Sequence, residues 1–591
     1  MISNVYTHGK LSEEKQTMAK TLYKANFNDK LPLGGIATGH LYLQNDGSVI
    51  SDNFCSFLIK AEKDGELLDV RVLQSSKNSF FSLPCFEKSE SFSYFPFAEI
   101  LLSDTSFPAS VKLSAFSPFI PLSDTDSGIP AVMFEFEITN TSNERLDFSI
   151  CNISGNTNPC FYNRMGCTDT GEAYLFLSGN KESESNNCIA TNSKNVSFCE
   201  YGHSCDDLCE NFVKNQTLLN TVLRNDNDTA SFGALCSHFS LAQNETQKIS
   251  FCYSWYHPEN DFSRNYYAQY FESSLECASY LFRQEERLKR SSMDFCKYVS
   301  GATLPENILK EVNNDLFKFI EKNFIRLDDG RLISDCDEHF EDFESFINRS
   351  DNLSYLFPGL EHSQTEYFYK NALYETASDK ETVLAILKSY RKFVLTADRD
   401  ALIEEWYYIV KCMEKLFGED GKQKCKADTA SITACIQAAV FMSEAVRDKK
   451  RFELYTSILE EKPIEQFSMD ITSGFAKLCE ISGFEYDAEK MHIGFAPKSD
   501  ICPLDDGGTF RCFFCTPKSY GYVEEGIDYI EINLLHGSLD IKSFGVPRTP
   551  RLVQYGGRNW RFENKNLVAI LDSTLEITPT KKLTIFIDIK Q

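Results

Sequence analysis

The chain has 591 residues, of which 42% are hydrophobic and 13% are aromatic, and its formal net charge is −26. This length exceeds a single hydrophobic core, so we expect two or three domains, and the apolar content excludes bulk disorder. The acidic balance argues against nucleic acid and anionic membranes as partners, because like charges repel, and is compatible with a neutral substrate such as a sugar.

Residues 1–16, MISNVYTHGKLSEEKQ, contain no apolar segment typical of a signal peptide. No run in the chain is long and apolar enough to form a transmembrane segment. The 21 cysteines are scattered through strand-like and helix-like segments, which is typical of reduced, buried thiols. We therefore expect a cytoplasmic protein.

Two groups of thiols could suggest a metal site. Residues 199–209 hold three cysteines and a histidine without the short Cys-x-x-Cys spacing of zinc sites. Cys512 and Cys515 have that spacing, and Cys502 is near, but no fourth ligand accompanies them and the segment alternates like a strand. We expect no metal and no cofactor.

Turn chemistry alternates with short strands at residues 31–54. Gly34, Gly35 and Gly39 permit tight turns, and Asn45-Asp46-Gly47 is typical of a β-hairpin. Since no Lys-Ser/Thr pair follows the glycines, a turn between strands is favoured over a phosphate loop.

Short strands broken by polar turns continue to residue 258 and predict a large β-sandwich. Within them, residues 116–142 begin with two X-Pro pairs and turn formers. They continue as a strand, Ala131 to Thr139, whose alternation places Val132, Phe134, Phe136 and Ile138 on one face.

Helical periodicity replaces this pattern after residue 258. Leu304-Pro305 begins one helix, and further helices are predicted over 352–376, 380–396, 400–418, 430–447 and 464–482. Their short connections indicate antiparallel helix pairs. Strands return in the last hundred residues.

Several strings in the chain resemble glycoside hydrolase family 116, the β-glucosidases that include the non-lysosomal glucosylceramidases. They are PLGGIATG followed by DG, FPFAEI, the stretch 116–142, WYHPEN at 255–260, and the strands around 492–545. The resemblance implies a β-sandwich followed by helix pairs that close into a six-hairpin (α/α) toroid around an active site.

The resemblance and the periodicity together predict a multidomain β + α protein. We expect an N-terminal β-sandwich over 1–258, a linker helix over 259–300, a shortened toroid-like helical domain over 301–485, and a C-terminal β-strand segment over 486–591. The domain is shortened because the chain passes almost directly from Leu454 to FAKLCEISGF, which resembles the family's final helix.

Retaining glycosidases need two carboxyl groups about 5–5.5 Å apart. In the family, the nucleophile Glu precedes a helix with Leu-Phe-Pro, which 356–358 resemble. Counting back without gaps places Ser350 at that position; with a gap, Glu344 takes it, unless it belongs to a solvated acidic loop. Asp428 is the carboxylate left in the shortened acid/base loop, and a helix N-cap is its alternative role.

We therefore expect a pseudoenzyme that binds a glucoside or glucan, or that assembles with a protein partner or with itself through the incomplete helical domain. The first alternative is a weak β-glucoside hydrolase that uses Glu344 and Asp428. The second is a structural protein with no sugar role.

Overall fold

The structure is a computed structural model that describes residues 23–76, 82–158, 162–179, 184–221, 231–260, 263–321, 324–334, 356–357, 360, 369, 372–373, 377–461, 474–498 and 508–589. The chain divides into two compact units. The N-terminal unit comprises Leu22–Cys296 and Leu316–Asp329, and the C-terminal unit contains Lys297–Asp315 and Gly330–Gln591. No helix among these described residues is long and apolar enough to cross a membrane.

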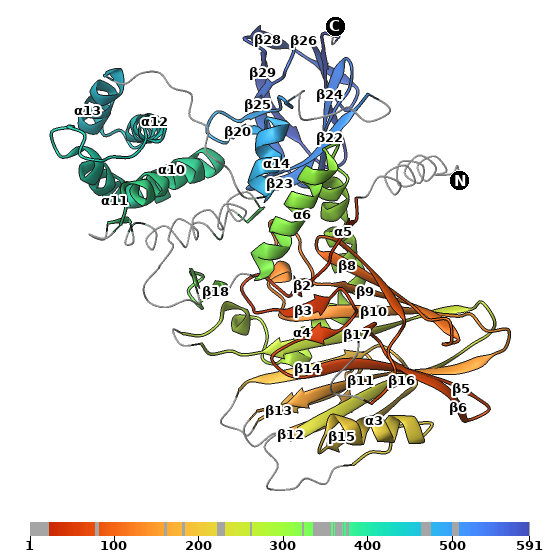
Figure 1. The fold of residues 1–591 in the computed structure, drawn as a ribbon. Helices are drawn as coiled ribbons and strands as arrows, with labels where there is room; N and C mark the ends of the chain where they lie inside the picture. The colour runs from red at the N-terminus through yellow and green to blue at the C-terminus, as the bar shows by residue number, and fades with distance from the viewer. Residues whose placement is uncertain are drawn as a thin grey trace. The chain divides into compact units, whose positions relative to one another are not determined.

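Three sheets build the N-terminal unit (Figure 1). The nine-stranded sheet has the order β1 (Ala25–Asn26), β7 (Lys88–Tyr94), β8 (Phe97–Ser103), β9 (Ala109–Phe116), β10 (Ala131–Asn140), β17 (Thr246–Tyr256), β14 (Asn186–Thr191), β13 (Ala173–Ser178) and β12 (Tyr162–Cys167). The five-stranded sheet has the order β15 (Val196–Gly202), β16 (Ser231–Leu241), β11 (Leu146–Asn156), β5 (Cys55–Lys63) and β6 (Glu66–Val72). The small sheet contains β2 (Lys30–Leu33), β3 (Leu41–Gln44) and β4 (Val49–Ile50).

The two large sheets face each other and share a phenyl-rich core, so the predicted β-sandwich is confirmed. The ring of Phe57 on β5 lies 4.9 Å from that of Phe136 on β10 and 5.5 Å from that of Phe251 on β17. All four predicted inward residues of β10 are fully buried. Ala131 and Met133 are buried as well, because α4 covers the opposite face of this part of the strand.

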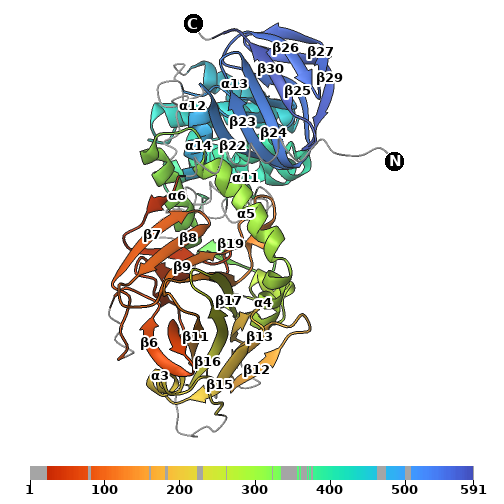
Figure 2. The same ribbon diagram turned by 90° about the vertical axis from the view of Figure 1, so that its right-hand side faces the viewer.

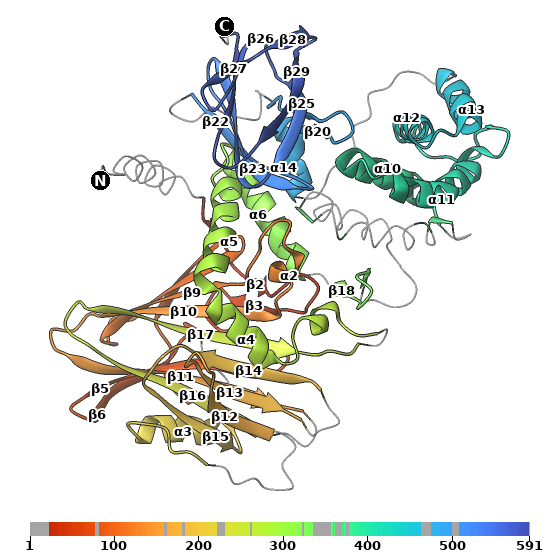
Figure 3. The ribbon, with the colours of Figure 1, turned by 180° about the vertical axis from the view of Figure 1, so that it is seen from behind.

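The predicted linker helix over 259–300 is divided in the structure. A 3-10 turn (Tyr266–Gln269) precedes α4 (Ser274–Arg283) and α5 (Glu285–Ser300). Ser273 caps α4 by accepting a hydrogen bond from the Glu276 N–H, and α4 lies against β14 and β17 (Figure 3). Figure 2 shows β7, β8 and β9 side by side in the same unit. The other helices here are α2 (Asp124–Ser127) and α3 (Cys205–Lys214).

The C-terminal unit begins with helices. Those predicted over 380–396, 400–418 and 430–447 are confirmed as α10 (Asp379–Thr396), α11 (Arg399–Phe417) and α12 (Thr429–Ala445), which form one group in Figure 1. A further helix, α13 (Lys449–Glu460), follows α12 after a short turn and was not predicted. Most of 352–376 lies outside the described residues, and α14 (Gly474–Ser482) is the described helical part of 464–482. The chain also forms α6 (Glu306–Glu321) and β19 (Leu332–Ser334), whereas β18 (Phe324–Arg326) belongs to the N-terminal unit.

The predicted C-terminal strands form two further sheets, drawn in blue in Figure 2. One has the order β20 (Glu485–Asp487), β21 (His492–Gly494), β25 (Leu539–Gly545), β29 (Val568–Ile577) and β28 (Phe562–Lys565). The other has the order β22 (Phe510–Thr516), β23 (Ser519–Glu525), β24 (Tyr529–Gly537), β30 (Leu583–Ile587), β26 (Pro550–Tyr555) and β27 (Arg558–Trp560).

Candidate functional site

Three stretches that are far apart in the sequence meet in the N-terminal unit: the glycine turn 34–39, the loop 117–129 and the end of β17. The Ile36 N–H donates to the Ser127 carbonyl at 2.7 Å. The indole Nε1 of Trp255 donates to the Thr38 carbonyl at 2.5 Å. A Cβ at Gly35 would lie 2.5 Å from the Ile129 carbonyl oxygen, so only glycine permits this approach.

The loop 117–129 is held from inside by Ser127, which is fully buried. Its hydroxyl accepts a hydrogen bond from the Ile120 N–H at 2.8 Å and donates to the Ile120 carbonyl at 3.0 Å. These two bonds close the loop on itself, so the backbone around the short helix α2 has a defined conformation.

Asp126 ties the same loop to the helices that follow the sandwich. Its carboxylate accepts two hydrogen bonds from the Arg287 guanidinium, at 2.8 and 3.0 Å, and one from the Tyr280 hydroxyl at 2.8 Å. Burial raises the pKa of Asp126, but the hydrogen bonds from Arg287 and Tyr280 outweigh it, and the net pKa is lowered. Asp126 is therefore an ionised anchor at neutral pH and not a proton donor.

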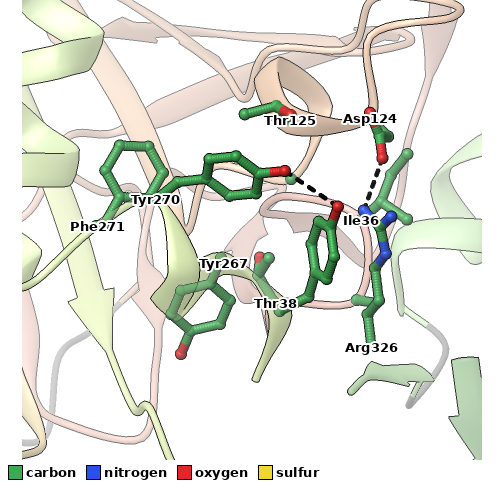
Figure 4. A pocket seen from close by; sticks show the side chains of 11 residues that line it. Ile36, Thr38, Asp124, Thr125, Tyr267, Tyr270, Phe271 and Arg326 are labelled. Atoms are coloured by element: carbon green, nitrogen blue, oxygen red, sulfur yellow. Dashed lines mark hydrogen bonds and ion pairs between the residues drawn. The ribbon is translucent and has the colours of Figure 1, made fainter. Parts of the chain in front are cut away.

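A narrow pocket opens beside this junction (Figure 4). The Arg326 guanidinium forms an ion pair with Asp124 at 2.8 Å and stacks on the Tyr266 ring, 3.4 Å from its centroid. The Tyr266 and Tyr270 hydroxyls are 3.0 Å apart, and this hydrogen bond is the main cause of the raised pKa of Tyr266. The full lining is Ile36, Ala37, Thr38, Asp124, Thr125, Gly128, Tyr266, Tyr267, Tyr270, Phe271 and Arg326.

The size of this pocket limits what it can bind. Water can reach about 10 Å³ of it, which is close to the volume that one water molecule requires. The Nε of Arg326 is buried and has no hydrogen-bond partner among the described residues. The pocket therefore suits a water or a single hydroxyl group and is too small for a sugar ring.

Of the predicted catalytic residues, Asp428 is described and Glu344 is not. Asp428 is exposed and is the N-cap of α12, where its carboxylate accepts a hydrogen bond from the Ser431 N–H at 2.9 Å. That hydrogen bond lowers the pKa of Asp428. Glu344 and Ser350 lie outside the described residues.

The described thiols of the two cysteine groups are buried in ordinary packing, and Cys502 lies outside the described residues. Cys205 and Cys209 are one turn apart on the buried face of α3, and Cys512 and Cys515 are interior residues of β22. Within the described part of the chain, no group of three or more His, Cys, Asp or Glu could hold a metal ion.

Sequence reasoning missed Arg326 and the tyrosines that it meets. The string YYAQYF falls within the linker helix predicted over 259–300, and the helices α4, α5 and α6 separate its tyrosines from Arg326 in the sequence. A residue pair this distant carries no periodic signal, so only the tertiary structure brings the ring and the guanidinium together.

Comparison with known proteins adds one sequence match. The family model described as "beta-glucosidase 2, glycosyl-hydrolase family 116 N-term" matches residues 31–288. This range contains the glycine turn, the loop 117–129, the end of β17 and every residue that lines the narrow pocket except Arg326. No curated protein matches the chain.

Solved structures show only distant likeness. A protein described as a kojibiose phosphorylase from the human microbiome is 9% identical, with 94% of this chain and 92% of that chain covered and a TM-score of 0.43. A bacterial glucoamylase complexed with acarbose is 10% identical, with 85% and 75% covered and a TM-score of 0.38. Both TM-scores are below 0.5, so the likeness to family 116 rests on the sequence match over residues 31–288 alone.

Proposed function

Because residues 31–288 belong to the N-terminal domain family of the family 116 glycosyl hydrolases, we propose that this protein binds a carbohydrate, a glucoside or a glucan, without hydrolysing it. The observation that carries the proposal is this match, together with the convergence of its glycine turn, its 117–129 loop and Trp255 in one place. The domain is that of a carbohydrate-active family, and the loss of turnover is our proposal.

The absence of turnover is supported by the state of the described carboxylates. Asp126 is paired with the Arg287 guanidinium and its pKa is lowered, whereas a general acid needs a raised pKa. The lowered pKa of Asp428 is likewise unfavourable for a proton donor at neutral pH. At the position that the family resemblance gives to the nucleophile, Ser350 offers no carboxylate.

We also propose that α10–α13 are part of a shortened (α/α) toroid and that the protein is cytoplasmic. None of the described cysteines is in a disulfide, which supports a reducing compartment. An assembly role, with a protein partner or with a second copy, belongs to the same proposal and is tested by the mass of the purified protein in solution.

The alternative is a weak β-glucosidase that uses Glu344 and Asp428. The deciding experiment measures hydrolysis of an aryl β-glucoside by the wild type, Glu344→Gln and Asp428→Asn. Asn is as good an N-cap as Asp, so Asp428→Asn removes the acid without uncapping α12.

Turnover that either substitution abolishes would refute the proposal and identify the pair. No turnover, together with a thermal shift on adding glucosides or glucans, would support carbohydrate binding. Neither turnover nor binding would favour a structural protein with no sugar role.

A further inference from the structure

A second pocket lies at one end of the five-stranded sheet of the N-terminal unit. Here β5 and β16 begin, β6 has just ended, α3 begins, and the β3–β4 hairpin lies alongside. Its volume is about 450 Å³. The lining residues are Gln44, Ser48, Val49, Ile50, Ser51, Asn53, Phe54, Cys55, Ser56, Gln74, Ser76, Cys205 and Phe232.

The chemistry of this lining is uniform in one respect: none of the lining residues carries a formal charge. Hydroxyl and amide groups supply the polar part, and Val49, Ile50 and two phenyl rings supply most of the apolar part. The rings of Phe54 and Phe232 meet edge to face, with centroids 5.9 Å apart. Ligand sites of proteins combine such apolar walls with a few placed polar groups, in volumes of about 300–1,000 Å³.

Asp46 organises two of the hydroxyl groups. Its Oδ1 accepts a hydrogen bond from the Ser48 Oγ at 2.6 Å, and its Oδ2 accepts one from the Ser76 Oγ. Asp46 itself does not line the pocket. The Ser48 hydroxyl has a second acceptor, Gln44 Oε1, at 2.5 Å. Because the hydroxyl hydrogens of the two serines point to these protein acceptors, the serine oxygens offer lone pairs to a ligand, which suits the hydroxyl donors of a sugar.

Gln74 adds rigidity to the same wall. The Gln74 side chain is buried, and its Nε2 donates to the Ser76 backbone carbonyl at 2.9 Å. The backbone carbonyl of Gln74 accepts a hydrogen bond from the Phe86 N–H at 2.9 Å. The wall is therefore largely formed before a ligand arrives, which lowers the entropic cost of binding.

From these observations we propose that this pocket is a binding site for a neutral mono- or disaccharide. The choice of a carbohydrate as the ligand rests on the proposed function. The choice of a neutral carbohydrate rests on the uncharged, hydroxyl-rich lining of the pocket. A sugar of this size fits a pocket of about 450 Å³, whereas the narrow pocket beside Arg326 admits about one water. An anionic sugar is disfavoured, because Asp46 lies behind the serines and the lining holds no cation.

The test is calorimetric titration of the intact protein with glucose, maltose and cellobiose, and with glucuronate as the charged analogue. Ile50→Trp places a large ring at the pocket, and Ile50 is 45% exposed, so the ring need not enter the core. Leu68→Trp is the matched control, since Leu68 is 51% exposed and does not line the pocket. Ser48→Ala removes one hydroxyl group from the pocket lining with minimal change in shape. If Ile50→Trp does not fold, the sugar affinity of Ser48→Ala tests the site instead.

The expected result is binding of a neutral sugar by the wild type and Leu68→Trp, at least about tenfold weaker binding by Ile50→Trp, and several-fold weaker binding by Ser48→Ala. Unchanged affinity in both pocket variants would overturn this site while leaving the proposed function intact. Absence of any sugar binding in the wild type would overturn both. Glucuronate binding as tightly as glucose would overturn the neutral assignment.

Discussion

Lys392 on α10 donates a hydrogen bond to Glu405 on α11, and both side chains are buried within the helical group. The second carboxylate oxygen of Glu405 accepts a hydrogen bond from the Ser389 hydroxyl at 3.0 Å, and that hydroxyl is also bonded to the fully buried Tyr369. The ion pair therefore belongs to a buried polar network that links the helices.

This relationship predicts a large, asymmetric effect of substitution. Glu405→Leu should lower the free energy of unfolding by about 3–5 kcal/mol, because it removes the carboxylate that pairs with the buried Lys392 charge. The double variant Lys392→Met/Glu405→Leu should recover most of that loss. Urea denaturation measures both. Lys422→Ala, on an exposed pair with Asp420, serves as the control. If Glu405→Leu lowers the free energy of unfolding by as little as Lys422→Ala does, the prediction is contradicted.

Arg326 should stabilise the N-terminal unit mainly through its stacking on Tyr266. We expect Arg326→Ala to lower the free energy of unfolding by about 1–2 kcal/mol, from the loss of a partly desolvated cation–π contact and the Asp124 ion pair. Arg326→Lys should retain only part of this stabilisation, because an ammonium group does not stack on an aromatic ring as a guanidinium does. Arg264→Ala, on the exposed pair with Glu184, is the comparison. Equal stability of the lysine variant and the wild type would refute the stacking argument.

Asp126 should make stability depend on pH on the acid side. Its pKa is lowered in the folded protein, so its contribution is complete above the unfolded pKa of about 3.9 and is lost as the pH falls through the folded pKa. The difference in unfolding free energy between wild type and Asp126→Asn should therefore be largest at neutral pH and shrink below about pH 4. Arg287→Met should reduce the same acid-side dependence. A difference independent of pH would contradict this origin.

Asp428 should act on stability as an N-cap, whatever its part in catalysis. Asp428→Ala should lower the free energy of unfolding by about 1 kcal/mol, because the Ser431 N–H loses its acceptor. Asp428→Asn should be close to neutral. Thermal denaturation of the three proteins at neutral pH measures this, and equal losses in both variants would show that the charge matters more than the cap.

Local pattern was sufficient for much of the fold. The alternation in β10 placed Val132, Phe134, Phe136 and Ile138 correctly in the core, because period-two burial is a property of the strand itself. Helical periodicity likewise located α10, α11 and α12 within a residue or two. The helix α13 was missed because only Tyr455 and Ile458 are buried on it, which is too little to produce a clear stripe.

Sequence alone therefore determined the order of β-rich, helical and β-rich segments, the capping role open to Asp428, and the likeness of residues 31–288 to a carbohydrate-active family. Tertiary structure decided the contacts between distant residues: Arg326 on Tyr266, Lys392 with Glu405, and Asp46 behind Ser48 and Ser76. The physical reason is that periodicity and capping follow from neighbours along the chain. The two pockets instead form where strand ends and loops that are far apart in sequence are brought together by burial of the sheets between them.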